Sequence, residues 1–272
     1  MIETFTCQSS DFVLIRKGQE KPLPVSLYGT LQTGDQIHVF REGCSITLLL
    51  NDNERVTVDY ATTKVQPYPV PTVDVPSKTI VGNMIEFASN WLNELSQPRQ
   101  EDSIDIGARG RELAIPLLVK NNAKLVAGKN TVYLAWKGGK LPYWLKVQRN
   151  HRPAENWEAT TINATTIALK KPDFELQPNT YYWVRLKDSL ENEVIMRFEV
   201  VTDLQMSQSA KTEEQAIRES RIDERIKRTL RAAWLAKPGK EWRFEAYQQV
   251  AGEDNYRPAL LIKEALEAGK QP

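Results

Sequence analysis

Short runs of alternating apolar and polar residues occupy roughly the first seventy positions. In DFVLIRKG, residues 11–18, Phe12 and Leu14 point to one side and Val13 and Ile15 to the other. The segment CSITLLLNDNERVTVDY, residues 44–60, is typical of two strands joined by a polar hairpin turn at residues 51–53. Several short strands with tight turns predict a small β-roll over residues 1–70.

The apolar period changes after a segment rich in proline. YPVPTVDVPSK, residues 68–78, holds three prolines and is expected to be a stiff linker. From there apolar residues recur every three or four positions, which predicts a connecting helix. These residues are Ile80, Met84, Phe87 or Ala88, Trp91 and Leu95.

Residues 111–203 return to short strands separated by turns, the pattern of an antiparallel β-sandwich. One of these strands, in LQPNTYYWVRLKD, residues 176–188, is rich in aromatic residues. Alternation places Tyr182, Val184 and Leu186 on one face of the strand. The opposite face carries Tyr181, Trp183, Arg185 and Lys187. We expect Tyr182 to lie in the core. We therefore interpret the aromatic cluster as part of an ordinary sandwich strand rather than as a ligand-binding platform.

The rest of the chain has the period of helices. Ile222, Ile226, Leu230 and Trp234 follow one another at four-residue spacing, and Pro238-Gly239 ends that helix. Two further helices are predicted, one carrying Trp242 and Tyr247 and one beginning near Pro258. The predicted fold is therefore multidomain and mainly β with α: a small β-roll (1–70), a linker with a connecting helix (71–110), an antiparallel β-sandwich (111–203) and a C-terminal helical bundle (204–272).

The first region resembles the FecR-like domain of bacterial regulatory and envelope proteins over about residues 10–68. The resemblance rests on an L-x-x-G-D-x-I turn between strands and on the hairpin that follows. The matched positions are Leu31, Gly34, Asp35, Ile37, Leu48, Asp52 and Val56. It implies a β fold without catalytic residues.

The sandwich and the tail carry resemblances of their own. Residues 111–203 are similar to immunoglobulin-like and fibronectin type III-like domains, with Trp136 as the expected core aromatic. The matched positions after it are Leu176, Pro178, Tyr182 (or Tyr181), Trp183 and Val184. The helical tail resembles part of a tetratricopeptide-type repeat. Both resemblances imply a fold and no chemistry.

Charge argues against several classes of ligand. The chain has 36 basic and 35 acidic residues and a net charge of +1, so it lacks the basic excess that nucleic acid binding requires. A local exception is conceivable, because Trp144, Lys146, Trp183 and Arg185 would form a basic aromatic strip if their strands were neighbours. No apolar run reaches bilayer length, which predicts no membrane insertion.

Candidate chemistry is sparse. Cys7 and Cys44 are read as free thiols in strands, and with the N-terminal sequence this predicts a cytoplasmic protein. His38 is read as an ordinary strand residue, and His151, in a loop beside Arg152 and Glu155, is the better candidate for a functional histidine. We predict no catalytic residues, no metal site and no cofactor.

These observations favour a non-enzymatic adaptor or regulator in a bacterial signalling or defence system. It is expected to bind another protein, for example a sigma factor, a protease or a signalling ATPase. The predicted contact residues are Trp183 and the apolar stripe of the tail, for which we expect a partner protein rather than the sandwich or a second copy as the cover. The predicted contact residues of the tail are Ile226, Leu230 and Trp234 of that stripe, with Trp242 and Tyr247 of the following helix. The alternatives are a carbohydrate or cell-envelope binding protein that uses the sandwich aromatics, and an unrecognised hydrolase.

Overall fold

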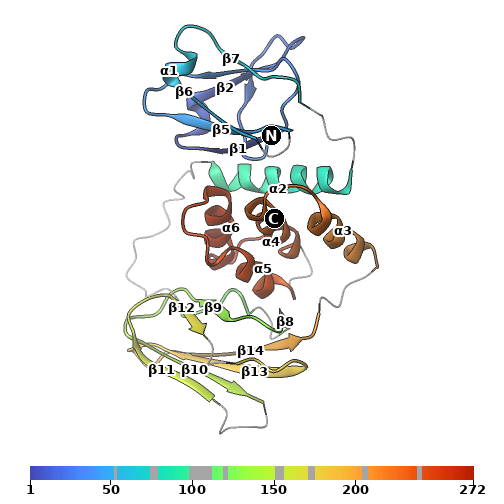
Figure 1. Cartoon of the computed structure of the whole chain (residues 1–272). Coiled ribbons are helices and arrows are strands. Elements are labelled where there is room, and N and C mark those ends of the chain that lie inside the picture. The colour runs from blue at the N-terminus through green and yellow to red at the C-terminus, as the bar shows by residue number, and fades with distance from the viewer. Residues whose placement is uncertain are drawn as a thin grey trace. The chain divides into compact units, whose positions relative to one another are not determined.

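A computed structural model describes most of the chain, which is mixed α and β with four sheets and C-terminal helices among the described residues (Figure 1). It divides into two compact units, Met1–Gln97 with Thr212–Leu230, and Pro98–Lys211 with Arg231–Pro272. This division differs from the four consecutive regions expected from the sequence, because the tail is shared between both units. The described residues are 1–51, 54–73, 79–97, 112–118, 122–150, 156–170, 175–203, 208–237 and 241–272.

The β part of the first unit has two antiparallel sheets with strand orders β1-β5-β6 and β3-β2-β4-β7. The predicted hairpin forms, with Leu49 opposite Arg55, although its tip at residues 52–53 lies outside the described residues. The strands are β1 (Ile2–Phe5), β2 (Phe12–Ile15), β3 (Leu23–Pro24), β4 (Gln36–Val39), β5 (Ser45–Leu49), β6 (Arg55–Asp59) and β7 (Tyr68–Pro69), with short helices η1 (Ser9–Asp11) and α1 (Tyr60–Thr63).

The L-x-x-G-D-x-I segment forms a structural turn. Gly34 adopts a φ of +81°, which favours glycine, and the next residue, Asp35, is buried. The Asp35 carboxylate accepts hydrogen bonds from Gln32 N at 2.8 Å and from Arg16 Nε and Nη2 at 3.0 and 2.8 Å. Burial alone would raise the pKa of Asp35, but the Arg16 and Gln32 hydrogen bonds outweigh it and lower that pKa. The polar residues of this motif therefore hold the turn together.

The predicted connecting helix is present as α2 (Ile80–Ser96) and belongs to the first unit. Thr79 caps its first turn by accepting a hydrogen bond from Gly82 N at 3.1 Å. Its buried side includes Met84, Ala88 and Trp91, as the spacing predicts, whereas Ile80, the first residue of the predicted stripe, is exposed. Ser89 Oγ donates to Leu27 O at 2.7 Å, so the helix is tied to the β part of the unit by a buried hydrogen bond.

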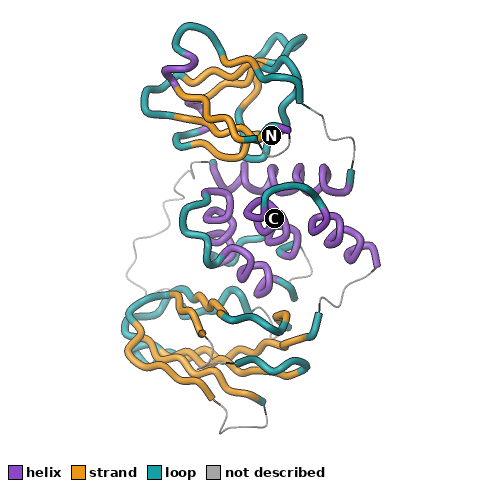
Figure 2. The backbone as a smooth tube through the Cα atoms, viewed as in Figure 1, coloured by secondary structure: helices purple, strands orange, loops and turns teal. Residues whose placement is uncertain are grey.

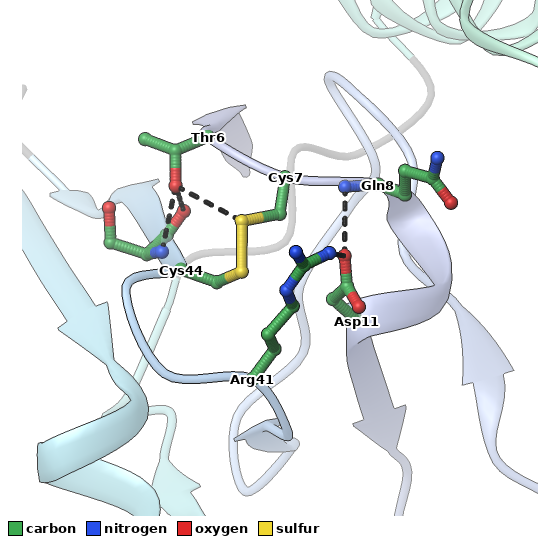
Figure 3. Close-up of a disulfide and its surroundings, with 7 residues drawn as sticks. Thr6, Cys7, Gln8, Asp11, Arg41 and Cys44 are labelled. Carbon is green, nitrogen blue, oxygen red and sulfur yellow. Dashed lines mark hydrogen bonds and ion pairs between the residues drawn. A yellow bond between two sulfur atoms is a disulfide. The ribbon is translucent and has the colours of Figure 1, made fainter.

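Cys7 and Cys44 form a disulfide, which corrects the expectation of free thiols in strands (Figure 3). Cys7 follows β1 and Cys44 precedes β5, and the antiparallel register that places Phe5 opposite Ile46 brings the two cysteines opposite each other. The disulfide removes one basis of the cytoplasmic prediction, because such bonds persist mainly in oxidising compartments.

The first helix predicted in the tail is two helices, α3 (Gln208–Glu219) and α4 (Glu224–Leu235). The break coincides with Asp223, whose carboxylate accepts from Arg225 N at 2.8 Å and pairs with Arg55 at 3.0 Å. Arg55 also donates to the buried Glu3 at 2.7 and 2.9 Å. The start of α4 thus coincides with a long-range ionic cluster that local periodicity does not reveal.

The second unit holds a five-stranded sheet of order β11-β10-β13-β14-β8 and a two-stranded sheet β12-β9. Figure 2 shows the strands in orange and the helices in purple. All pairs are antiparallel except β8 with β14, where Ala123 lies opposite Phe198 in a parallel register. The strands are β8 (Ala123–Val126), β9 (Thr131–Ala135), β10 (Tyr143–Arg149), β11 (Asn156–Ile162), β12 (Thr166–Lys170), β13 (Thr180–Lys187) and β14 (Glu193–Val201); the helices that follow α4 are α5 (Arg243–Val250) and α6 (Arg257–Glu267).

The start of α5 and the residues before it satisfy the free edge of β8. Lys124 N donates to Glu241 O at 2.6 Å, and Val126 N donates to the Glu245 carboxylate at 3.0 Å. Glu245 is buried and is neutralised by Lys129 at 2.9 Å. These bonds give the edge amides of β8 the acceptors that a neighbouring strand would otherwise supply.

The edge of β9 is satisfied in the same way by one glutamine of α5. Gln248 Oε1 accepts from Tyr133 N at 2.8 Å while Gln248 Nε2 donates to Tyr133 O at 2.9 Å. Beside it, the buried Phe244 packs edge-on against Phe198 of β14, with 5.0 Å between ring centroids. The chain's own strands therefore cover part of the apolar surface of the tail, for which a partner protein was expected.

The end of the chain is held by buried polar groups of α5. Arg243 donates to Lys270 O at 2.6 Å and Gly269 O at 3.3 Å, and Tyr247 donates to Glu267 at 2.6 Å. Burial lowers the pKa of Arg243, and burial with the Glu267 contact raises that of Tyr247. These bonds connect α5 to the end of α6, so Tyr247 is part of a core.

Replacing both cysteines by serine should destabilise the first unit. The disulfide closes a loop with a sequence separation of 37 residues, for which the chain-entropy estimate is about 4 kcal/mol and the typical range about 2–4 kcal/mol. Denaturant unfolding of the wild type and of Cys7→Ser/Cys44→Ser would measure the difference. Mass spectrometry after alkylation without reductant should find no free thiol in the wild type, and two alkylated cysteines would contradict the pairing.

Candidate functional site

The outward side of the five-stranded sheet carries the candidate site. Along β13, Tyr182, Val184 and Leu186 are buried, so the alternate side chains point out of the sheet. The neighbouring strands contribute the same alternation in register. We define the outer face as Trp144, Lys146 and Gln148 of β10, Tyr181, Trp183 and Arg185 of β13, and Ile195 and Arg197 of β14.

The register arranges these side chains in rows across the three strands. Lys146 lies opposite Arg185, which lies opposite Ile195. In the next row Gln148 lies opposite Trp183, which lies opposite Arg197. Directly opposed side chains in an antiparallel pair have Cβ atoms about 4.5–5.5 Å apart, so each row is close enough for its members to interact with one ligand.

An exposed aromatic cluster occupies one end of the outer face. Tyr181 and Trp183 are 39% and 37% exposed, and Ile195 is 42% exposed. The Arg197 guanidinium lies over both rings, 5.2 Å from the centroid of Tyr181 and 5.9 Å from that of Trp183. The sheet therefore presents two large rings and an isoleucine to solvent, with one cation placed against the rings.

Two cations lie opposite each other in the centre of the face. Lys146 and Arg185 are directly opposed, and each also approaches an acid: Lys146 Nζ lies 3.7 Å from Glu158, and Arg185 Nε lies 3.6 Å from Glu193. Trp144 Nε1 donates to the same Glu158 at 2.7 Å, which orients the indole. Positive charge is thus concentrated on β10 and β13, between acids that lie on β11 and at the start of β14.

A pocket of about 390 Å³ opens where the face meets the β13–β14 hairpin. Asp188 at its wall accepts from the side-chain Nδ2 of Asn192 and from the backbone amides of Asn192, Lys140 and Leu190 at 2.9–3.0 Å, which shapes the hairpin. Burial would raise the pKa of Asp188, but these hydrogen bonds outweigh burial and lower that pKa. The carboxylate is therefore ionised, and its oxygens accept hydrogen bonds from the hairpin. The pocket is lined by Pro142, Tyr143, Trp144, Thr161, Arg185, Lys187, Asp188, Glu191 and Glu193.

A larger pocket, about 510 Å³, lies in the first unit between the β part and α2. Its charged side chains are Arg16 and Glu86, and Arg16 is engaged by Asp35 and Thr30. The guanidinium of Arg16 is therefore already hydrogen-bonded within the turn at Gly34 and Asp35.

Of the predicted contact residues, only Trp183 lies on the outer face. The other five are buried in the structure, so in this conformation they offer little surface to a partner. They are Ile226, Leu230, Trp234, Trp242 and Tyr247.

The basic aromatic strip, which was predicted on the condition that its strands are neighbours, is present in the structure. It comprises Trp144, Lys146, Trp183 and Arg185, and β10 pairs directly with β13. Tyr181 completes the face on β13, as the alternation predicts. Ile195 and Arg197 of β14 were not identified from the sequence, although the alternation of residues 193–201 carries their signal.

The other candidates for chemistry stay apart. His38 packs against Phe40 with ring centroids 4.4 Å apart, and His151 lies outside the described residues. Cys7, Cys44 and Asp11 offer metal-type ligand atoms within 4.8 Å of one another, but the disulfide occupies both sulfurs (Figure 3). None of the helices in the described part of the chain has the length and hydropathy needed to cross a bilayer.

Comparison of the chain with family models and with curated proteins found no match. The outer face is therefore interpreted from its own geometry.

Tyr182 and Trp183, adjacent in sequence, should differ sharply in their contribution to stability. Tyr182 is buried, stacks on Phe198 at 5.5 Å and accepts a hydrogen bond from Gln177 N at 2.8 Å, so Tyr182→Ala should cost about 3–5 kcal/mol. Trp183→Ala removes an exposed ring and should cost about 1 kcal/mol or less. Denaturant unfolding of both variants measures the order, and an equal or larger cost for Trp183→Ala would contradict the assignment of the outer face to solvent.

Proposed function

We propose that the protein is a non-enzymatic adaptor or regulator and that it recognises a protein partner through the outer face. The observation that carries the proposal is the exposed Tyr181–Trp183–Arg197 cluster on a regular sheet. Tyrosine, tryptophan and arginine are the residues that most often dominate the energy of protein interfaces. Residues on strands are also positioned more rigidly than residues on loops.

We further propose that the second unit is an immunoglobulin-like or fibronectin type III-like sandwich. Its support is the strand order β11-β10-β13-β14-β8, with β8 parallel to β14, beside the two-stranded sheet β12-β9. The Tyr182 hydroxyl accepts from Gln177 N, five residues upstream, as in the tyrosine corner of such domains. Domains of this type commonly serve as recognition modules, so this proposal agrees with an adaptor role.

For the first unit we propose a FecR-like β domain. The turn at Gly34 and Asp35 and the β5–β6 hairpin support it, because both occur at the positions the resemblance requires. In this proposal the motif residues maintain the fold and leave recognition to other surfaces.

The principal alternative is binding of a carbohydrate to the same aromatics. Sugars stack on open aromatic faces, whereas Arg197 lies over both exposed rings, and the Trp144 indole is held by Glu158. This arrangement favours a protein partner over a glycan.

Tyr181→Ala/Trp183→Ala should abolish capture of the partner while the protein stays folded. The measurement is quantitative affinity capture from the native cell with the full chain as bait, alongside thermal melts. Phe40→Ala/Val65→Ala removes two exposed apolar side chains from the first unit and is the matched control. Retention of every captured protein by Tyr181→Ala/Trp183→Ala would overturn the proposal. Binding on a glycan array that is lost in the same variant would favour the carbohydrate alternative.

A further inference from the structure

The centre of the outer face contains two opposed side chains of like charge. Lys146 and Arg185 are directly opposed across β10 and β13. Like charges in this position repel each other, and the fold offsets the repulsion with one carboxylate for each cation: Glu158, directly opposite Lys146 on β11, and Glu193 at the start of β14. The acids that each cation approaches, Glu158 and Glu193, lie 3.7 and 3.6 Å away.

The space beside this pair is apolar and aromatic. Ile195 completes the row of Lys146 and Arg185, and Trp183 follows in the next row along β13. A group that reaches both cations therefore also contacts an exposed isoleucine and an exposed indole. This combination suits a carboxylate side chain with apolar neighbours.

We infer that the outer face binds an acidic peptide segment of the protein partner, with a carboxylate between Lys146 and Arg185 and apolar side chains on Trp183 and Ile195. This inference rests on the proposed function and specifies the chemistry of the partner. A carboxylate matches the guanidinium of Arg185 and the ammonium of Lys146 in charge-assisted hydrogen bonds.

The charges around the pair favour a peptide over a nucleic acid. Glu158 on one side and Glu193 on the other would repel a long polyanion that crosses the face. One or two carboxylates within an otherwise apolar segment fit between these acids.

Selection from a random peptide library displayed on phage, with the full chain as target, tests the inference. Enriched peptides should carry Asp or Glu beside apolar residues. Each enriched peptide is then synthesised in its acidic form and with Asn or Gln in place of the acids, and binding is measured by fluorescence anisotropy. The acidic form should bind at least about tenfold more tightly than the amide form, since hydrogen bonds to a charged group are the stronger ones, and added salt should reduce the difference.

Lys146→Glu/Arg185→Glu should weaken binding of the acidic peptide by at least about tenfold. Lys64→Glu/Lys170→Glu makes the same change in net charge at exposed positions away from the face and should leave binding unchanged. If the doubly reversed variant does not fold by thermal melt, Lys146→Gln/Arg185→Gln replaces it, with the same expected direction.

Three results would overturn the inference: no enriched peptide, enriched peptides without acids, or acidic peptides that bind Lys146→Glu/Arg185→Glu as well as the wild type. Tighter binding of an oligothymidylate than of any peptide, lost in that variant, would also overturn it and assign the face to nucleic acid. Non-acidic peptides that lose binding on Trp183→Ala would leave the proposed protein-binding function standing without the acidic specificity. The two proposals therefore fail on different results.

Discussion

The second unit depends on the hydrogen bonds by which α5 and the residues before it satisfy the open edges of β8 and β9. Among the described strands β8 pairs only with β14 and β9 only with β12, so amides on the open edge of each need other acceptors. Glu241, Glu245 and Gln248 supply them from the residues around α5. Phe244 adds the apolar part of the contact by packing on Phe198. The last part of the chain is thus a component of the β unit.

This closure changes which surface is available for recognition. A tail that is loosely attached could offer Trp234, Trp242 and Tyr247 to a partner, but these side chains are buried. Exposed aromatic residues are instead found on the outer face, where the alternation of β13 turns Trp183 outward and Tyr182 inward. One face of β13 therefore packs in the core, and in our proposal the opposite face binds the partner.

Local patterns predicted much of the fold, whereas long-range pairing determined the rest. The period of residues 80–95 was sufficient for α2, and the alternation of residues 180–187 correctly placed Tyr182 and Trp183. The disulfide, in contrast, follows from the register of β1 on β5, which no single segment reveals. The break between α3 and α4 coincides with the contact of Asp223 with Arg55, far away in sequence.

The candidate site shows the same division between local and long-range information. Trp144, Lys146, Trp183 and Arg185 could be named from the sequence only on the condition that β10 and β13 are neighbours. The structure meets that condition, and it adds Arg197 and Ile195 from β14 through the register. The opposition of Lys146 to Arg185 is a property of that register alone, so it could not have been inferred from composition or spacing.

Residue-resolved hydrogen exchange of the full chain tests most directly whether the tail completes the β unit. The amides of Val126 and Tyr133 donate only to side chains of α5 in this account, at 3.0 and 2.8 Å. We predict that they exchange as slowly as the amides of the β9–β12 ladder, because opening them requires α5 to leave the sheets. If both amides exchange as fast as those of exposed loops while the ladder stays protected, α5 is not seated on these edges, and the tail is again available as a recognition surface.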